Sequence, residues 1–300
     1  MSTGVEGSWR SLSPADAGYP RLLKEIRAAP EIEVAGVLDP DAEMVAVVGS
    51  RRCSTYGDDL AYELGAELAG AGLVVVSGLA RGIDGAAHRG ALDAGGLTVA
   101  VMGTGRDTIY PHQHIALAHR ITSQGALVTQ FPLETVARPE NFPQRNATIS
   151  GMSLGVVVVE ARRRSGAMLT AGAAGNQGRV VMAVPGSIHN PNSRGCHDLV
   201  RDGARLVTGA EEVIQELRND PLFQLLKRPD PDPGRQRYGD ARDVILELLR
   251  GRAMTLDEVA DRLRVTAREA ATALATLRLD GAVEVRDGVY QERRHRGLGA

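Results

Sequence analysis

The middle of the chain alternates between two patterns of hydrophobic and polar positions. Short, mostly β-branched runs that are apolar on both faces are separated by longer stretches with helical periodicity. The apolar runs predict buried strands at Val45–Val48, Leu73–Ser77, Thr98–Met102, Ala126–Thr129, Val156–Glu160 and Val180–Val184. The stretches between them predict helices at Asp58–Ala71, Asp84–Ala94, Gln113–Ser123, Arg145–Leu154 and Met168–Gln177. A further short strand is expected at Arg205–Val207, followed by a helix that Thr208 caps and that ends at Leu217.

This order of elements predicts an α/β fold. Strands that are apolar on both faces are typical of a parallel sheet covered by helices on both sides. Repeated βα units imply a doubly wound, Rossmann-like and mostly parallel sheet. We assign this sheet to residues 44–218, after a short extension at 1–43 with a weak helical pattern near Leu22–Ile26.

The C-terminal part of the chain predicts a second, smaller domain. Three closely spaced prolines in the segment RPDPDPGRQR predict a linker over residues 219–239, because proline is not accommodated inside a helix. Residues 240–292 then show a helical stretch, two capping boxes and alternating valines around a hairpin-turn dipeptide. In order these are Ala241–Leu249, Thr255 with Glu258, Thr266 with Glu269, and Asp287–Gly288. Three helices and a β-hairpin are typical of a winged-helix domain, with a small helical bundle as the alternative, and residues 293–300 form a basic tail.

Composition excludes several classes of protein. The 35 basic and 37 acidic residues give a net charge of −2, which excludes a histone-like or tail-driven nucleic-acid binder. The two cysteines, Cys53 and Cys196, provide neither a disulfide framework nor a metal cluster, so we expect no metal. No apolar stretch approaches the roughly 18 residues of a membrane span. The N-terminus lacks the pattern of a signal peptide, so we expect a cytoplasmic protein without membrane contact.

The loops that follow the strands carry the candidate chemistry, because an open parallel sheet binds its ligands there. Five of these loops contain glycine together with hydroxyl or arginine side chains. Glycine lets backbone N–H groups approach an oxyanion, and helix N-termini add favourable partial charge. The sequence therefore predicts a groove lined for phosphate. Its candidate residues in these loops are Gly49, Ser50, Arg51, Ser77, Gly78, Arg81, Gly82, Asp84, Gly103, Gly105, Arg162, Ser165 and Gly166.

Known phosphate and hydrolase motifs do not account for these loops. The dinucleotide fingerprint G-x-G-x-x-G is absent after the first strand, and a chain with two lysines has no P-loop. The string Gly151–Gly155 matches G-x-S-x-G, but a helix precedes it and a strand follows, the reverse of a nucleophile elbow. Asp84 and His88 lie four residues apart on one helix without an accompanying nucleophile. We therefore expect no cofactor and no catalytic residues.

The segment Arg138–Asn146 has a different character. It contains Phe142, one of three phenylalanines in the chain, followed by Arg145 and Asn146 at the start of a predicted helix. Exposed aromatic rings beside arginines hold single-stranded nucleic acid, since a base stacks on the ring while the backbone charge is neutralised nearby. The alternative is that Phe142 fills the core.

An ordered series of motifs links these features. They are GSR, SGLARGID followed by AAH, GTGRDTIYP, FPQRN, VVVVEARRRSGAMLTAGAA and AVPGS, ending at Gly203-Ala204. In this order, over residues 19–210, the chain resembles the DprA (Smf) family of DNA-processing proteins. The resemblance implies a Rossmann-like domain that binds single-stranded DNA, interacts with RecA and loads it onto incoming strands in natural transformation, often with a C-terminal winged helix. We also expect a homodimer.

The family's phosphate-binding pocket maps onto the loop residues above and adds Phe142, Arg145, Asn146 and Thr170. Three positions depart from the family pattern: Ala147, Gln130 and His197. These departures bear on the expected affinity for DNA more than on the expected fold.

The distribution of charge bears on which part holds DNA. Residues 44–210 contain 15 arginines and 12 acidic residues, whereas residues 240–292 contain 8 basic and 11 acidic residues. We therefore expect DNA in the Rossmann groove, and a winged helix that contacts protein or a second copy of the chain. An alternative function is that of a nucleotide-binding or phosphoribohydrolase-like enzyme of a related Rossmann-like group. Its catalytic carboxylate has no counterpart in residues 165–173.

Overall fold

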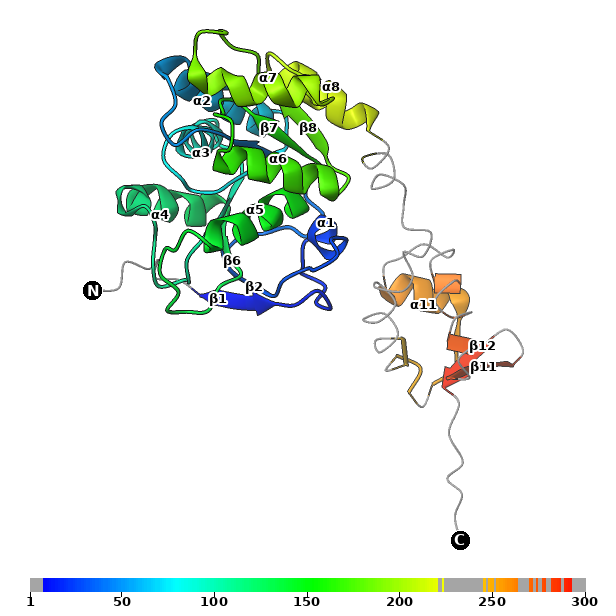
Figure 1. Cartoon of the computed structure of the whole chain (residues 1–300). Helices are drawn as coiled ribbons and strands as arrows, with labels where there is room; N and C mark the ends of the chain where they lie inside the picture. The colour runs from blue at the N-terminus through cyan, green and yellow to red at the C-terminus, as the bar shows by residue number, and fades with distance from the viewer. Residues whose placement is uncertain are drawn as a thin grey trace. The chain divides into compact units, whose positions relative to one another are not determined.

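The computed structural model describes residues 8–220, 223, 245–246, 248–250, 252–263, 270–271, 274, 277–278, 282–286 and 289–292. The chain divides into two compact units, residues 1–226 and 227–300 (Figure 1).

A nine-stranded sheet forms the centre of the first unit, in the order β1-β2-β6-β5-β4-β3-β7-β8-β9. Neighbouring strands from β6 to β9 are parallel, whereas β1 and β2 run antiparallel at one edge. The strands are β1 Trp9–Leu12, β2 Ile32–Gly36, β3 Met44–Val48, β4 Val74–Ser77, β5 Thr98–Val101, β6 Ala126–Thr129, β7 Gly155–Val158, β8 Val180–Ala183 and β9 Arg205–Leu206. The doubly wound, mostly parallel sheet predicted from the sequence is confirmed.

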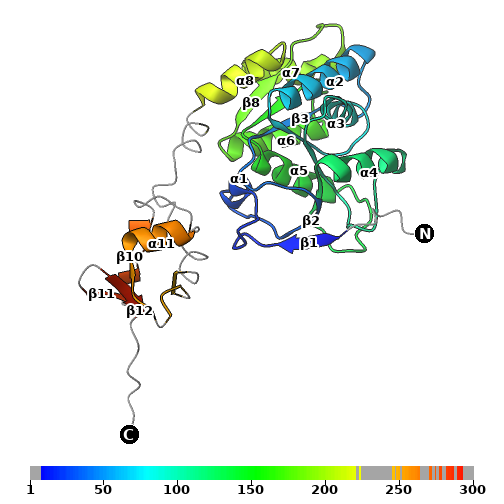
Figure 2. The same ribbon diagram turned by 180° about the vertical axis from the view of Figure 1, so that it is seen from behind.

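Helices cover both faces of this sheet. Buried residues of α5, α6 and α7 pack on one face, and those of α2, α3, α4 and α8 pack on the other. Helix α1 contributes Leu23 to the first cluster and Leu22 to the second. Helices α5 and α6 lie in front of the sheet in Figure 1, and the view from behind in Figure 2 brings α2 and α8 forward. The helices are α1 Arg21–Lys24, α2 Thr55–Gly70, α3 Ile83–Asp93, α4 Ile115–Gln124, α5 Asn141–Met152, α6 Gly166–Asn176, α7 Arg194–Arg201 and α8 Ala210–Asn219.

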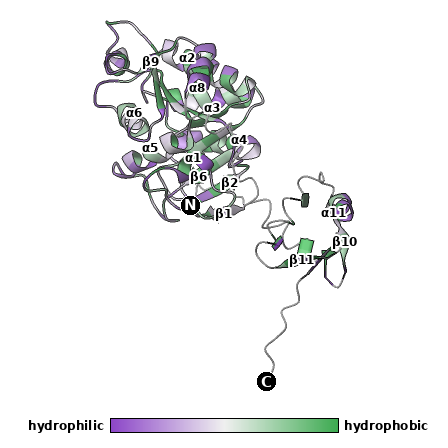
Figure 3. Cartoon of the chain, turned by 90° about the vertical axis from the view of Figure 1, so that its right-hand side faces the viewer, coloured by the Kyte–Doolittle hydropathy of each residue, from purple (hydrophilic) through white to green (hydrophobic). Residues whose placement is uncertain are grey.

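The central strands are buried on both faces, which explains their uninterrupted apolar sequence. Successive residues alternate between the two helix layers, with Ala46 and Val48 facing one layer and Val45 and Val47 the other. Figure 3 shows the hydrophobic residues concentrated in these strands. The core is thus a sheet of small and β-branched residues between two layers of helices.

Four elements differ from the sequence prediction. No strands were expected before residue 44, yet β1 and β2 extend the sheet, and α7 was not predicted. Strand β1 is half exposed, so its sequence lacks the long apolar run of a central strand. Helix α5 begins at Asn141 rather than Arg145, since Pro143 is tolerated in a first helical turn.

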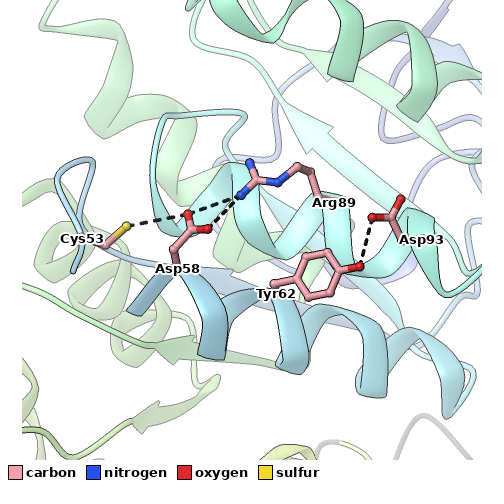
Figure 4. A network of polar contacts seen from close by, with 5 residues as sticks. All are labelled: Cys53, Asp58, Tyr62, Arg89 and Asp93. Carbon is pink, nitrogen blue, oxygen red and sulfur yellow. Dashed lines mark hydrogen bonds and ion pairs between the residues drawn. The ribbon is translucent and has the colours of Figure 1, made fainter. Parts of the chain in front are cut away.

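Helices α2 and α3 approach each other closely. A Cβ atom added to Gly90 would lie 1.9 Å from the carbonyl oxygen of Tyr62, so glycine is required for this spacing. Arg89 Nη2 lies 3.1 Å from Asp58 Oδ2, and the Tyr62 hydroxyl donates a 3.0 Å hydrogen bond to Asp93. Figure 4 shows this polar network, which also includes Cys53. The network ties the two helices together outside the glycine contact.

The second unit contains β10 Met254–Thr255, α11 Leu256–Leu263, β11 Val283–Arg286 and β12 Val289–Glu292. Its three-stranded sheet has the order β10-β12-β11. The predicted hairpin is confirmed by the antiparallel pairing of β11 with β12. The first predicted capping box is confirmed as well, because Thr255 N donates to Glu258 Oε2 at 2.8 Å and Glu258 N donates to Thr255 Oγ at 3.3 Å.

Several predictions fall on residues that the structure does not describe. These are the second capping box, the turn dipeptide Asp287–Gly288, the tail at 293–300, the predicted helix at 241–249 except for residues 245, 246, 248 and 249, and the linker at 219–239 except for residues 219, 220 and 223. Among the described residues, Phe223 is 5% exposed and packs in the core of the first unit. In the described ranges, no helix combines the length and apolar character needed to cross a bilayer.

Candidate nucleic-acid interface

A pocket of about 760 Å³ opens among the loops that follow the parallel strands. The loops after β3, β4 and β7 line it together with helix α5, and it includes the point between β3 and β7 where the strand order reverses and doubly wound sheets bind their ligands. Twelve of the residues expected from the sequence line it: Gly49, Ser50, Arg51, Arg81, Asp84, Phe142, Arg145, Asn146, Arg162, Ser165, Gly166 and Thr170. Gly78 and Gly103 line a smaller adjoining hollow, which shares Arg51 and Phe142 with the pocket.

The pocket is strongly cationic. Its lining includes five arginines and one carboxylate, that of Asp84. None of the five takes part in the ion pairs found among the described residues. The five are Arg51, Arg52, Arg81, Arg145 and Arg162. Guanidinium groups without carboxylate partners suit a polyanion, because an exposed one can donate two parallel hydrogen bonds to a phosphate.

Arg145 differs from the other four because it is buried, with 3% of its surface exposed. Its Nη1 donates 2.6 Å hydrogen bonds to the carbonyl oxygens of both Gly78 and Val101. Burial lowers the pKa of Arg145 to about 10, an effect that the nearby Asp84 carboxylate opposes. The guanidinium therefore remains charged at neutral pH while it fixes the ends of β4 and β5.

Phe142 lies half-buried between two of these arginines. The guanidinium carbon of Arg51 lies 4.6 Å from the centre of the ring, and that of Arg145 lies 5.7 Å from it. A Cβ atom on Gly103 would come within 2.9 Å of the ring, so glycine makes room for it. Phe142 is thus part of the pocket wall and not of the core.

Tyr110 adds a second aromatic ring that the sequence analysis did not single out as a site residue. It lines the pocket with 42% of its surface exposed, 6.1 Å from Phe142 at an angle of 48°. Arg52 lines the pocket as well and was not among the expected site residues. An exposed aromatic residue in a glycine- and arginine-containing loop is the signal that could have indicated Tyr110.

Asp84 anchors the loop after β4. Its Oδ2 accepts a 3.1 Å hydrogen bond from the backbone N–H of Gly78, and burial raises the pKa of its carboxyl against the opposing charge of Arg145. His88 bonds instead to Thr98 Oγ at 2.7 Å, and burial lowers the pKa of His88 to about 3. The two side chains therefore have separate structural partners.

Three expected site residues shape the loops without lining either hollow. Ser77 is fully buried and donates a 2.6 Å hydrogen bond to the carbonyl oxygen of Val47. Gly82 has a φ of +73°, which favours glycine, and a Cβ atom there would lie 2.3 Å from Ser50 O. A Cβ atom on Gly105 would lie 2.1 Å from the carbonyl oxygen of Leu133. These residues support the site from behind.

The N-terminal end of α6 forms one side of the pocket. Asn146 Nδ2 donates a 3.1 Å hydrogen bond to Gly166 O, and Thr170 Oγ donates to the same oxygen at 3.3 Å. The buried Ser165 Oγ has no hydrogen-bond partner among the described residues. Helix α6 begins at the exposed Gly166, so this end of the helix offers backbone amides to an anion.

The three departures from the family pattern lie off the pocket lining. Gln130 accepts a hydrogen bond from Thr148, and His197 Nε2 donates to the carbonyl oxygen of Gly186 at 2.9 Å. The carbonyl oxygen of Ala147 accepts from Gln177 Nε2 at 2.9 Å. Each position serves local packing between secondary-structure elements.

Comparison with protein families gives two matches. Residues 10–218 match the family described as DNA recombination-mediator protein A, and residues 228–288 match the DprA winged helix domain. The chain is 42% identical to Protein Smf of Escherichia coli over 289 residues, which cover 93% of this chain and 76% of that protein. It is 42% identical to DNA processing protein DprA of Streptococcus pneumoniae over 208 residues, 69% of this chain and 73% of that protein.

Solved structures that resemble the chain include two DNA processing proteins. The crystal structure of DNA processing protein A from Streptococcus pneumoniae matches with a TM-score of 0.67 and 42% identity, over 70% of this chain and 74% of that one. DNA processing protein A from Helicobacter pylori, whose single-stranded DNA binding mode has been described, matches with a TM-score of 0.64 and 24% identity. This second match covers 72% of this chain and 98% of that one. Because the identity is 24%, the match supports the fold alone.

Proposed function

The chain belongs to the DNA recombination-mediator protein A family, which includes the DprA and Smf proteins, and from that premise we propose that it binds single-stranded DNA in the pocket of its Rossmann-like unit. We further propose that it protects incoming strands, loads RecA onto them during natural transformation, and acts as a homodimer. A cytoplasmic location remains a prediction from the sequence.

The observation that carries the proposal is the make-up of the pocket. Five arginines and two aromatic rings surround a single carboxylate, and that carboxylate is held by a backbone amide. Arginines neutralise a sugar-phosphate backbone, while aromatic rings accept any base by stacking. A pocket of this kind holds a strand with little preference for its sequence.

Arg51 and Phe142 form the centre of the proposed site. Because the guanidinium of Arg51 lies over the ring, a base can stack on Phe142 only after Arg51 turns aside toward a phosphate. The alternative stack places the base on the outer face of Arg51, with Phe142 behind it. In both arrangements the base is unpaired and turned into the pocket, which favours a single strand over a duplex.

We propose a non-catalytic role. Asp84 is committed to the amide of Gly78 and His88 to Thr98, so neither is placed as a general acid or base with a nucleophile. Incubation of the protein with AMP tests the enzymatic alternative. No release of adenine is expected, and adenine release that a pocket variant abolishes would contradict this part of the proposal.

Titration of a fluorescently labelled oligothymidine, followed by anisotropy, tests the binding proposal. We expect saturable binding of the single strand, competed by unlabelled single strands of other sequence and far less by duplex of the same length. Equal affinity for duplex would contradict the proposal. RecA filament assembly on strands coated with a single-strand-binding protein tests the loading role, with faster assembly expected when the protein is present.

A further inference from the structure

We propose that Asn192 is a positioning residue that holds two arginines of the DNA pocket. Asn192 is itself held in place by a hydrogen bond to the buried carboxylate of Glu160. This inference rests on the proposed binding of single-stranded DNA. Asn192 lies in a short 3₁₀ turn, Pro191–Ser193, and was not among the residues expected from the sequence.

The side chain of Asn192 is 7% exposed and uses both of its polar atoms. Its Nδ2 donates to the carbonyl oxygen of Arg52 at 2.9 Å and to Glu160 Oε2 at 3.3 Å. Its Oδ1 accepts a 2.9 Å hydrogen bond from Nε of Arg162. One amide therefore connects the loop after β3 with the loop after β7, and both loops line the pocket.

Glu160, two residues after the end of β7, holds Asn192 in place in turn. It is 2% exposed, and its Oε1 accepts from Ser54 Oγ at 2.6 Å and from Asn190 Nδ2 at 3.0 Å. Its Oε2 also accepts from the backbone N–H of Ser54 at 2.9 Å. The carboxylate is thus satisfied by neighbouring donors, and it joins the start of α2, the Asn192 turn and the arginine loop.

This network determines which atoms of Arg162 remain for a ligand. The bond to Asn192 uses Nε, so the two terminal nitrogens of the guanidinium stay available to a phosphate. A long side chain held in one orientation loses less freedom when it binds than one that is unrestrained. The position of Arg52 is restricted in a similar way, because Asn192 holds its backbone carbonyl while its exposed side chain lines the pocket.

Asn192→Ala removes the whole connection and provides the test. We expect binding of a labelled oligothymidine to weaken about tenfold, equal to about 1.4 kcal/mol. We also expect the slope of log affinity against log salt concentration to fall by roughly 0.7, the value for one phosphate contact with a single strand. Arg162→Ala should have a similar or smaller effect, and the double variant should be little worse than Asn192→Ala alone, because the loss of Asn192 already removes the contact that Arg162 makes.

A matched control separates positioning from loss of structure. Gln177 is another amide side chain with two hydrogen bonds, to Ser150 and to the carbonyl oxygen of Ala147, and none of these residues lines the pocket. Gln177→Ala should lower the melting temperature without changing the salt slope. An unchanged slope for Asn192→Ala, or fully additive losses in the double variant, would overturn the inference.

Arg162→Lys keeps the inference testable if Asn192→Ala does not fold. It retains the positive charge of an exposed side chain but cannot donate from Nε to Asn192. We expect most of the loss seen with Arg162→Ala, and wild-type affinity for Arg162→Lys would overturn the inference. Failure of the wild-type protein to bind oligothymidine would instead refute the proposed function itself.

Discussion

Replacement of Arg51 by alanine gives the sharpest prediction for the pocket. The side chain is exposed and lies over the ring of Phe142, outside the ion pairs of the described residues. Its loss should therefore remove a ligand contact without leaving a buried carboxylate unpaired. A hydrogen bond to a charged group contributes about 1.5–3 kcal/mol, so affinity for a single strand should fall by at least about tenfold.

The salt dependence of binding gives a second, independent measure of the contact that Arg51 makes. For a single strand, each phosphate contact adds about 0.7 to the slope of log affinity against log salt concentration. Arg51→Ala should reduce the slope by that amount at every sequence tested. The free energy of unfolding should change by less than about 0.5 kcal/mol, as for most exposed positions.

Arg120→Ala is the matched control, because it removes the same charge from α4. Arg120 is half exposed, pairs with Asp93 at 2.5 Å, and does not line the pocket. Anisotropy titrations at four or more salt concentrations should give wild-type slopes for Arg120→Ala. Equal slopes for the Arg51 variant and the wild type would refute the placement of phosphate beside Arg51.

Three further predictions concern stacking, pH and packing. Phe142→Leu should weaken oligothymidine binding by about 1–3 kcal/mol without changing the salt slope, as measured by the same titrations. His88 is neutral when folded, with a pKa of about 3, so unfolding takes up a proton below about pH 6.5. Stability should therefore fall as pH drops from 6.5 toward 3, by about 1.4 kcal/mol per pH unit, and urea unfolding of His88→Gln should show a flatter dependence. Gly90→Ala should lower the free energy of unfolding by about 1–3 kcal/mol, since its Cβ would meet Tyr62 O at 1.9 Å, and an unchanged urea midpoint would contradict the close packing.

The central sheet could be predicted from sequence because its strands are buried on both faces. Each is a short apolar run of four or five residues, mostly β-branched and followed by glycine or small polar residues, which favours a strand over a buried helix. Strand β1 could not be found in this way, because its middle residues Arg10 and Ser11 are exposed at the sheet edge. Helix α7 could not be predicted for a similar reason, since only Gly195 and Cys196 are buried in it.

The position of the pocket could be predicted from the loops that follow the strands. The role of each residue in the pocket could not. Arg145 was expected to neutralise phosphate, and the structure shows it bonded to two backbone carbonyls beneath Phe142. Loop composition does not reveal burial, which depends on how α5 packs against β4 and β5. For the same reason the contribution of Asn192, which joins residues 30 and 140 positions away, is visible only in three dimensions.

Photo-crosslinking of the full chain to single-stranded DNA containing 5-bromodeoxyuridine tests the central claim most directly. Crosslinks are expected on the peptides that carry Tyr110 and Phe142, the two aromatic residues that line the pocket. Excess unlabelled single strand should suppress these crosslinks, and Arg51→Ala should reduce them. Crosslinks confined to residues 240–292, with none on the pocket peptides, would contradict the placement of the strand in the Rossmann-like unit.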